Sequence, residues 1–551
     1  MNPKNTPFKL GALALGAGLL CALPAHALEL DSGDPDTKIR LDFTPKYSMA
    51  YRMQDASTDL TPAGNENDGN LNFAKGLISN RVDLLTEFDF SHGNWGLRVS
   101  HTAWYDAMYM RGNANDGTKG VNNASGQAAN EFIQATVDQH GRGDQFLDAF
   151  VYGKGSLGDI PASVRLGRHA VQYGESVFFG QNGIAAAQGP VDVAKILSVP
   201  NWQFKEVLLP VEQLSGTLQV AEGVTLGGYY QFKWRPSKIP GVGSYFSNQD
   251  YIGGGRVYFS APPSLTTDAS KDQTPGDSGQ FGAQVRWAPT GGAFEYGLYA
   301  AQYHDKTPSA LVFDFINGNV RTVYAKNIKT VGASVSSSVG QLNWALEGSV
   351  RKDAPLASDP AVLAGAPTMP ANDCSGDASN PCYAVGDTGH LNLSGIYVLN
   401  KSSLWDGGAI VAELAWNRTL SVTKNPGSVG FGGLDPNATR DASAVRVIFE
   451  PQYFQVVPGL DLSIPMGIGY NFGGRSSAIS NFAGGASEAG DVTVGVKGKY
   501  QDWNFGLNYT AFFGTAKTFT VTDPSTPTRM LSYSQTLADR NYLSFNISRT
   551  F

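Results

Sequence analysis

Between residues 82 and 105, apolar and polar side chains alternate along two short runs that are separated by a tight turn. The first run sets apolar residues on one face against acidic residues on the other: Val82, Leu84, Phe88 and Phe90 against Asp83, Glu87 and Asp89. After a turn at 91–94, the second run opposes Trp95, Leu97 and Val99 to Arg98, Ser100 and Thr102. A period of two is the pattern of a β-strand with one buried and one polar face, so this stretch predicts a hairpin.

The same pattern recurs along most of the chain and predicts about 18 strands, with 16 as the alternative. Further hairpins are expected at 281–301, 331–351 and 492–513. Short turns are expected near 91–94, 156–161, 221–223, 289–292, 339–340, 401–407, 455–459 and 501–502. They alternate with long polar stretches at 54–76, 111–145, 172–211, 238–278, 305–327, 353–387, 422–440, 473–488 and 517–537.

This alternation of short and long connections decides the fold class. Bacterial outer-membrane barrels have an even number of antiparallel strands, short turns on the periplasmic side and long loops on the outside. The strands of a secreted β-sandwich or β-helix do not usually alternate their connections so regularly. The sequence therefore predicts an all-β protein, a transmembrane antiparallel β-barrel of the outer-membrane type.

The last residues, NYLSFNISRTF, form an alternating apolar strand, which would be a sticky edge in an open sheet. In a closed barrel this strand gains a neighbour on each side. We expect it to pair with the first strand at 46–53 and to present Leu543, Phe545, Ile547 and Phe551 outward. A strand that ends in Phe resembles the signal read by the barrel-assembly machinery, so Phe551 implies that machinery as a partner.

The N-terminus has the order of a secretory signal peptide: a basic start, a short apolar run and the small-residue triplet Ala25-His26-Ala27. We place cleavage near Ala27, which leaves 28–551 as a single barrel in the outer membrane of a Gram-negative cell, in contact with its lipid. The chain carries 41 basic and 48 acidic residues, a net charge of −7, and loss of Lys4 and Lys9 takes it to −9. An acidic chain argues against a nucleic-acid partner.

One long connection, 172–211, is unusually apolar for a loop. Apolar side chains of this number should not remain in water, so we expect the segment to fold into the lumen as a constriction or plug. A substrate gate and a fixed plug that stiffens the barrel are equally consistent with it. The candidate lumen or gate residues are Arg168, Glu175, Phe178, Phe179, Trp202, Lys205 and Glu206. Arg168 and Glu175 are expected to pair with inward charges of the barrel.

Charge and cysteine usage narrow the chemistry further. Inward positions of the strands carry both signs, which favours structural ion pairs over a strongly ion-selective lining. Cys374 and Cys382 lie in a loop of an exported protein and are expected to form a local disulfide. No complete nucleophile elbow, phosphate loop or zinc-protease motif is present, so we expect no enzyme activity, no cofactor and no metal.

Several stretches, in order along the chain, resemble the DUF 1302 family, a domain of unknown function. They are 70–90, 95–106, 164–184 (VRLGRHAVQYGESVFFGQNGI), 191–196, 205–211, 229–247 and 458–470 (PGLDLSIPMGIGY). The resemblance implies a proteobacterial outer-membrane protein and traffic in hydrophobic compounds such as sterols, lipids or aromatic substrates. It also implies export or efflux components as partners.

Two functions follow as hypotheses. The first is a channel or transporter for hydrophobic or amphipathic small molecules, gated by the 172–211 segment. The alternative is a structural, adhesive or export-complex-associated barrel without transport activity of its own, which the long polar loops suit equally well.

Overall fold

The chain folds into a closed antiparallel β-barrel of 18 strands, so the predicted fold class is confirmed and the count is 18 rather than 16. The computed structural model describes residues 28–30, 32–62, 64–123, 126–258, 265–267, 269–363, 381–427, 432–522 and 529–551. Residues 1–27 lie outside this part, and the cleavage near Ala27 stays a prediction.

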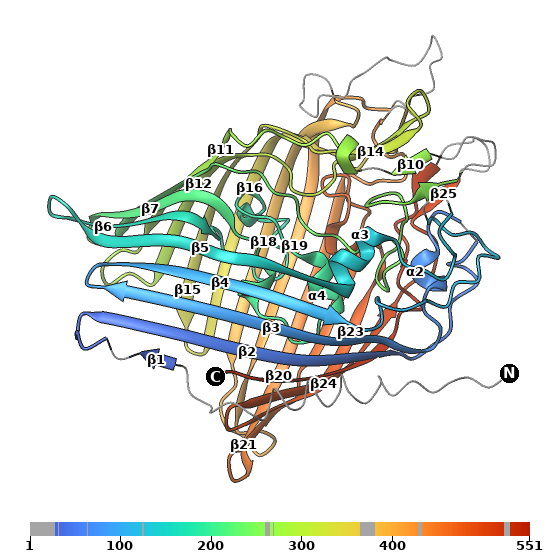
Figure 1. The fold of residues 1–551 in the computed structure, drawn as a ribbon. Coiled ribbons are helices and arrows are strands. Elements are labelled where there is room, and N and C mark those ends of the chain that lie inside the picture. Colours follow the sequence, from blue (N-terminus) through green and yellow to red (C-terminus); the bar gives the residue numbers. More distant parts are fainter. Residues whose placement is uncertain are drawn as a thin grey trace.

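The barrel strands follow one another around the ring in chain order (Figure 1). They are β2 (Thr37–Arg52), β3 (Gly76–His92), β4 (Trp95–Asp106), β5 (Arg142–Leu157), β6 (Ile160–His169), β7 (Val211–Ala221), β8 (Val224–Gln231), β11 (Gln280–Trp287), β12 (Phe294–Tyr303), β15 (Ile328–Val339), β16 (Leu342–Pro355), β18 (Val385–Val398), β19 (Gly407–Lys424), β20 (Asp441–Val457), β21 (Leu460–Ser463) continued by β22 (Met466–Gly473), β23 (Ala489–Tyr500), β24 (Trp503–Phe513) and β27 (Tyr542–Arg549). The ring closes where β27 pairs with β2, from Lys46↔Ser548 to Arg52↔Tyr542, as predicted. A short strand, β1 (Leu28–Leu30), pairs with the start of β2.

Short turns gather at one end of the barrel and long loops at the other (Figure 1). Eight connections within hairpins are short, the shortest being the two residues between β3 and β4, β5 and β6, β7 and β8, β15 and β16, β20 and β21, and β23 and β24. Several of these turns need a residue with positive φ, which glycine adopts without steric cost. Gly93 and Gly340 supply it with φ values of +56° and +59°.

The two faces of each strand differ as the alternation predicts. On β3, Val82 and Leu84 are exposed on the outer wall, whereas Asp83 and Glu87 are 3% and 5% exposed in the interior. The outer wall continues around the ring as exposed aliphatic side chains, including Leu166, Leu298, Val331, Leu414, Val494 and Leu507. A band of this kind is what a lipid-facing barrel presents.

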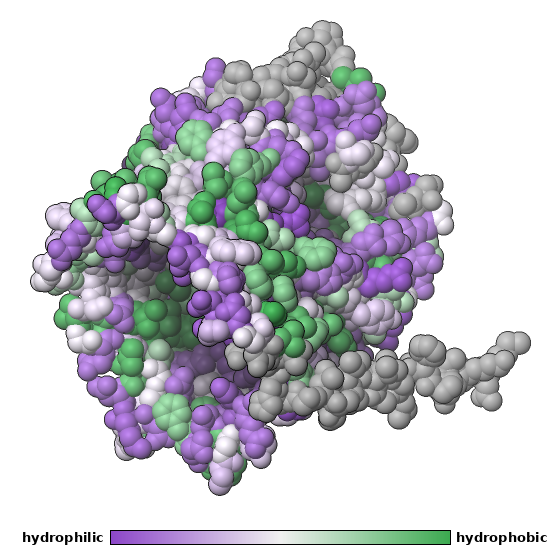
Figure 2. Space-filling model, turned by 60° about the vertical axis from the view of Figure 1, so that its left-hand side comes forward, coloured by the Kyte–Doolittle hydropathy of each residue, from purple (hydrophilic) through white to green (hydrophobic). Residues whose placement is uncertain are grey.

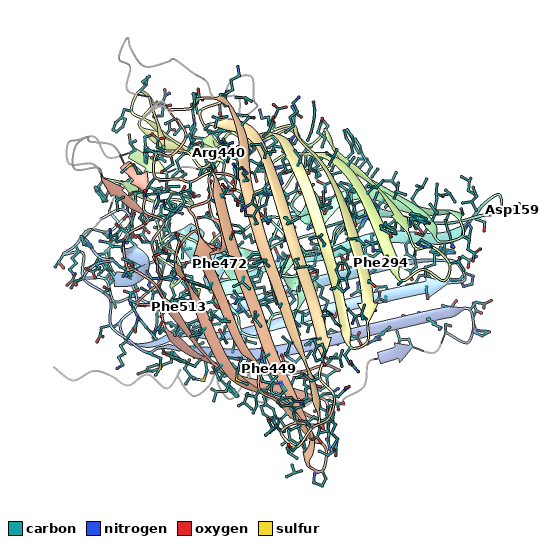
Figure 3. The ribbon with its side chains drawn as sticks, turned by 180° about the vertical axis from the view of Figure 1, so that it is seen from behind. Asp159, Phe294, Arg440, Phe449, Phe472 and Phe513 are labelled. Atoms are coloured by element: carbon teal, nitrogen blue, oxygen red, sulfur yellow. The ribbon has the colours of Figure 1, made fainter. Side chains whose placement is uncertain are left out.

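Aromatic side chains border the apolar band on both sides. Figure 3 shows Phe294 and Phe449 towards the turn end, which Asp159 marks, and Phe472 and Phe513 towards the loop end near Arg440. On β4, the exposed rings of Trp95 and Tyr105 are ten residues apart in sequence. At about 3.3 Å per residue and a tilt of about 40°, this spacing covers about 25 Å across the wall, the height of a membrane band.

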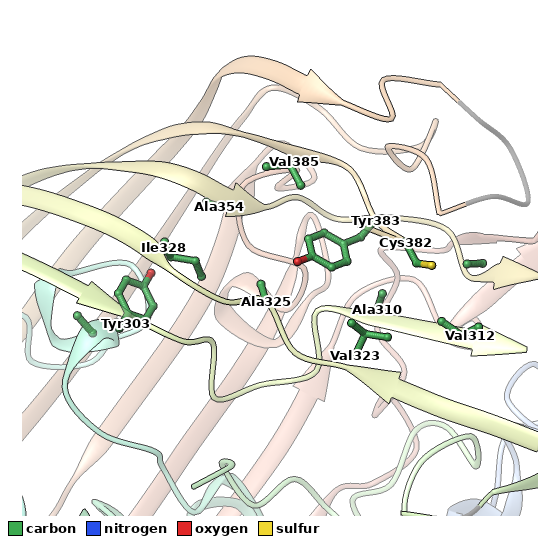
Figure 4. Packing of buried hydrophobic residues seen from close by; sticks show 12 residues of the cluster. Tyr303, Ala310, Val312, Val323, Ala325, Ile328, Ala354, Cys382, Tyr383 and Val385 are labelled. Atoms are coloured by element: carbon green, nitrogen blue, oxygen red, sulfur yellow. The ribbon is translucent and has the colours of Figure 1, made fainter. Parts of the chain in front are cut away.

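The long loops form a packed layer at their end of the barrel. It contains a five-stranded sheet of β9 (Arg256–Val257), β10 (Leu265–Thr267), β13 (Ala310–Asp314), β14 (Asn319–Val323) and β17 (Ala361–Leu363), and a two-stranded sheet of β25 (Thr520–Thr522) and β26 (Arg529–Leu531). A small core that includes Val312, Val323, Ile328 and Tyr383 lies beneath it (Figure 4). The loop layer is therefore a structure with its own packing.

Short helices complete the loops. They are α2 (Asp68–Leu71), α3 (Gln134–Thr136), the π-helical turn η1 (Val137–Gly141), α4 (Val193–Ser198) and α5 (Phe204–Val207), with 3-10 turns η2 (Ile184–Ala187), η3 (Ala269–Lys271) and η4 (Phe482–Gly484). No helix in the described part of the chain is long and apolar enough to cross a membrane.

The ring of the terminal Phe551, which was expected on the outward face, is covered by a neighbouring side chain. Its side chain is only 3% exposed, and the Arg549 guanidinium lies 4.7 Å from the ring centroid. The backbone of Phe551 exchanges two hydrogen bonds with Phe43 of β2, beyond the last pairs of β27. The last residue therefore closes the seam of the barrel under a stacked arginine, which alternation along the strand does not reveal.

Candidate functional site: a segment held inside the lumen

The connection between β6 and β7, residues 170–210, crosses the inside of the barrel. Its first half contacts β16, β18 and β19, although β7, β8, β11, β12 and β15 lie between β6 and β16 in the ring. Its second half contacts β2, β3 and β27, at the seam of the barrel. The segment is thus attached to two separate walls. We refer to 170–210 as the lumen segment.

The first attachment is built around the carboxylate of Glu413 on β19, which is 1% exposed. One oxygen accepts the backbone N–H groups of Val177 and Phe179, both at 3.0 Å, and that of Phe178 between them. The other accepts the Ser176 hydroxyl at 2.8 Å and an Asn392 amide N–H at 2.6 Å. Successive backbone N–H groups that converge in this way form an anion-binding nest, which here encloses a carboxylate from the opposite wall.

A second buried carboxylate, Glu347 on β16, holds the next turn of the segment. It accepts the backbone N–H groups of Glu175 at 2.5 Å and Ile184 at 2.6 Å. A side chain at Gly174 would collide with this carboxylate, and a Cβ at Gly183 would lie 2.6 Å from it, so the close approach requires glycine at both positions. Arg351, also on β16, donates to the carbonyl oxygen of Gly183 at 2.9 Å.

The second attachment consists of ion pairs and one amide contact. Glu206 is 4% exposed and lies 2.9 Å from the Lys195 ammonium and 3.9 Å from that of Lys46 on β2. Burial alone would raise the pKa of Glu206, but the two ammonium groups outweigh it and hold this pKa below its usual range. Lys205 pairs with Glu87 of β3. Asn201 donates to Asn546 of β27 at 2.7 Å.

The residues singled out from the sequence occupy different positions around this segment. Glu175 pairs with Arg286 of β11 at 2.6 Å, whereas Arg168 pairs at 2.5 Å with Glu212 on the adjoining strand β7. Phe178 is half-buried with its N–H on Glu413, and Phe179 lies 6.0 Å from the Phe482 ring, centroid to centroid. Trp202 is half-buried, and Lys205 and Glu206 make the contacts described above.

Glu413 and Asn182 were not among the candidate residues. Asn182 is 1% exposed and donates to Asn392 at 2.8 Å and to the Trp416 carbonyl at 3.1 Å. A signal for Glu413 was present, because an acid at an inward strand position must find donors when it is buried. Its partners in the lumen segment are more than 200 residues away in sequence, so the pattern does not identify them.

Other inward charges neutralise one another, which agrees with the ion-pair interpretation of the mixed signs. Arg98 lies 2.5 Å from Glu87, 2.9 Å from Asp89 and 3.3 Å from Asp148. Arg446 and Asp491 form a similar pair at 2.9 Å. These contacts line the wall beside the lumen segment.

A small cavity lies beside the lumen segment. A cavity between α4, the inner wall and the loops has a volume of about 10 Å³, room for one water molecule. It is lined by aromatic, aliphatic and polar side chains, among them Ile78, Arg81, Asp106, Tyr245, Phe246 and Tyr542. Towards the turn end the barrel is hollow, as Figure 2 shows where this end comes forward.

The predicted disulfide and the absence of a metal are not decided here. Cys374 lies outside the described residues, and Cys382 is buried at 4% exposure, so their bond stays a prediction. Within the described ranges, no three His, Cys, Asp or Glu side chains form a group suited to a metal ion.

The fold and the segment define a membrane-type β-barrel whose own chain fills its lumen. The chain belongs to the family described as "Protein of unknown function (DUF1302)", whose model matches residues 9–551. This confirms the resemblance seen in the sequence. No curated protein matches the chain.

Among solved structures, a BenF-like porin from Pseudomonas fluorescens Pf-5 is 11% identical over 94% of this chain and 98% of its own, with a TM-score of 0.42. OccAB2 of Acinetobacter baumannii is 11% identical over 93% and 98%, and OpdK of Pseudomonas aeruginosa is 10% identical over the same shares; both have a TM-score of 0.40. A likeness this weak carries no argument about the function of the present chain.

Proposed function

We propose that the protein is an outer-membrane channel for hydrophobic or amphipathic small molecules, closed in the described state by the lumen segment. The outer wall supports the location, because an apolar band bordered by aromatic rings suits a bilayer. The signal-peptide pattern before residue 28 supports export from the cytoplasm.

The observation that carries the proposal is the mode of attachment of the segment. Polar contacts hold it to both walls, through Glu413 and Glu347 on one side and Lys205 and Glu206 on the other. Such contacts are specific in geometry, yet they can be exchanged for water when the segment moves. A segment that served only to fill the barrel would be expected to hold on mainly through apolar packing.

The apolar surface inside the barrel supports the substrate class. Val177 and Phe204 belong to the lumen segment and are 43% and 52% exposed, although they lie inside the ring and away from lipid. Exposed apolar groups in an interior passage favour solutes that carry an apolar part.

The experiment compares two solutes in proteoliposomes that contain the refolded full chain or a variant lacking residues 175–205. The solutes are taurocholate, an amphipathic steroid, and sucrose, a polar solute of similar order of size. We expect proteoliposomes with the full chain to take up taurocholate at a rate well above that of protein-free liposomes, and to exclude sucrose. The deletion variant should admit both.

Three results would count against this proposal. Rapid sucrose entry through the full chain would make the protein a general diffusive porin and remove the gate. Exclusion of both solutes by the full chain and the deletion variant would favour the structural or adhesive role. Exclusion of both by the full chain and entry of both through the deletion variant would identify the segment as a fixed plug.

A further inference from the structure

Two aspartates lie side by side in the loop layer, far from the attachments of the lumen segment. Asp68 begins helix α2 in the β2–β3 loop, and Asp250 belongs to the β8–β11 loop. The backbone N–H of Asp68 donates to Asp250 Oδ2 at 3.2 Å. Asp68 Oδ2 accepts the backbone N–H of Asn122, from the β4–β5 loop, at 2.9 Å. Three loops therefore meet at the pair.

Both carboxylates are almost fully enclosed and incompletely bonded. Asp68 is 1% exposed and Asp250 is 0% exposed, and Oδ1 of each has no hydrogen-bond partner. The side-chain oxygens Oδ1 of Asn67 and Asn122, both 0% exposed, are also without a partner. Four unsatisfied oxygens on contiguous or hydrogen-bonded residues are costly to bury together.

The charge of the pair is not balanced by nearby side chains. Within the described residues neither aspartate forms an ion pair, and Glu66 adds a third negative group that acts on Asp250. Arg540, which lies close to Gly69, pairs with Asp539 at 3.1 Å. Burial raises the pKa of Asp68 to about 7, and burial together with repulsion from Asp68 raises the pKa of Asp250 well above its usual range. An isolated buried carboxylate pair must take up either a proton or a cation.

We propose that Asp68 and Asp250, with the amide oxygens of Asn67 and Asn122, form a divalent-cation site that ties three loops together, with Ca²⁺ as the preferred ion. Two carboxylates, amide oxygens and water are the oxygen ligands that Ca²⁺ takes. The set contains no imidazole or thiolate, which transition metals prefer. The inference does not depend on transport, since it concerns the loop layer alone.

A cation at this position would act on the stability of the loop layer. Glu66, next to Asn67, accepts the Tyr251 hydroxyl at 2.6 Å and the backbone N–H of Thr520, in the β24–β27 loop, at 3.0 Å. The ion would thus connect four of the long loops through a single cluster. Removal of the ion would leave the negative charges of this cluster unopposed.

The test measures binding of CaCl₂ by isothermal titration to the refolded full chain, which carries no lipopolysaccharide, after treatment with EDTA. The variants are Asp250→Asn and Asp68→Asn, and the matched control is Asp116→Asn, an exposed acid in the β4–β5 loop. We expect one ion per chain with Kd of about 10⁻⁴ to 10⁻³ M, as in extracellular calcium modules. Each site variant should weaken binding at least about tenfold, whereas the control should not.

Thermal unfolding supplies a second readout that does not require the variants to bind the ion. In EDTA, Asp250→Asn should unfold at a higher temperature than the unsubstituted chain, because it removes one of two repelling charges. In CaCl₂ this advantage should vanish or reverse. If no heat of binding appears and Ca²⁺ leaves the unfolding temperature unchanged, the pair holds a proton and the cation site is wrong. The proposal would also be wrong if Asp250→Asn and the control Asp116→Asn both bound Ca²⁺ as tightly as the unsubstituted chain, because the ion would then bind elsewhere.

Discussion

If the lumen segment is the gate proposed above, the nest around Glu413 should set how often it leaves the wall, and the substitution Glu413→Gln tests this. The glutamine has the same shape but no charge, so three backbone N–H groups at 177–179 keep a weaker acceptor. A hydrogen bond to a charged group contributes about 1.5–3 kcal/mol and a neutral one about 0.5–1.5 kcal/mol. The loss is therefore about 1 kcal/mol per bond, or about 3 kcal/mol for the three.

This loss of binding free energy determines how much more often the lumen segment is released from the wall. Because about 1.4 kcal/mol corresponds to a factor of ten, the released state should become roughly 100-fold more populated. Single-channel recording in planar bilayers measures it as the fraction of time that the channel conducts. The control is Glu222→Gln in an exposed turn, where the carboxylate accepts only the Thr290 hydroxyl. We expect that control to conduct as the unsubstituted chain does.

One result would refute the reasoning. If Glu413→Gln folds normally, as judged by circular dichroism and heat-modified migration on gels, and its conducting fraction stays within about twofold of the unsubstituted chain, the nest does not hold the segment. The opening would then have to involve the contacts with β2 and β3.

Two further predictions concern the same segment and the loop layer. Gly174→Ala should raise conductance, because φ at this position is +93° and the added Cβ would collide with the Glu347 carboxylate. The control Gly180→Ala should conduct normally, because the nearest atom to its added Cβ lies 3.7 Å away. Equal conductance of the two variants would argue against the close fit at Gly174. In EDTA, the stability of the chain should fall as the pH rises, because burial raises the pKa of Asp68 to about 7 and the pKa of Asp250 is also raised well above its usual range. The stabilisation by bound protons is complete below the unfolded pKa of about 4 and is lost as the pH passes 7. Unfolding temperatures measured from pH 4 to pH 8 with and without CaCl₂ check this, and a flat profile in EDTA would contradict it.

The strand pattern and the sidedness could be derived from the sequence because both are local. Alternation fixes which face of a strand is apolar, so Val350 is exposed and its neighbour Arg351 is only 7% exposed. The turn positions followed from loop length and from glycine and polar residues. The covered ring of Phe551 was missed, because stacking under Arg549 depends on how the seam closes.

The sequence predicted that the lumen segment folds inward, but it did not predict which residues attach it to the walls. An apolar connection with few charges indicated that residues 172–211 fold inward, and inward acids on the strands indicated that they need donors. Which acid meets which donor depends on the closure of the ring, because the Phe179 N–H and the Glu413 carboxylate are 234 residues apart in sequence. The pairing of Asp68 with Asp250, 182 residues apart, has the same origin.

The sequence by itself determined the strands, their two faces, the alternation of turns and loops, and the family. It could do so because a period of two and a turn are properties of neighbouring residues. The tertiary structure alone decided that Glu413 and Glu347 enclose the turn of the lumen segment and that two aspartates from different loops share one buried site. Both features arise when barrel closure brings distant residues together, and a buried charge must then be satisfied by the groups that this closure places around it.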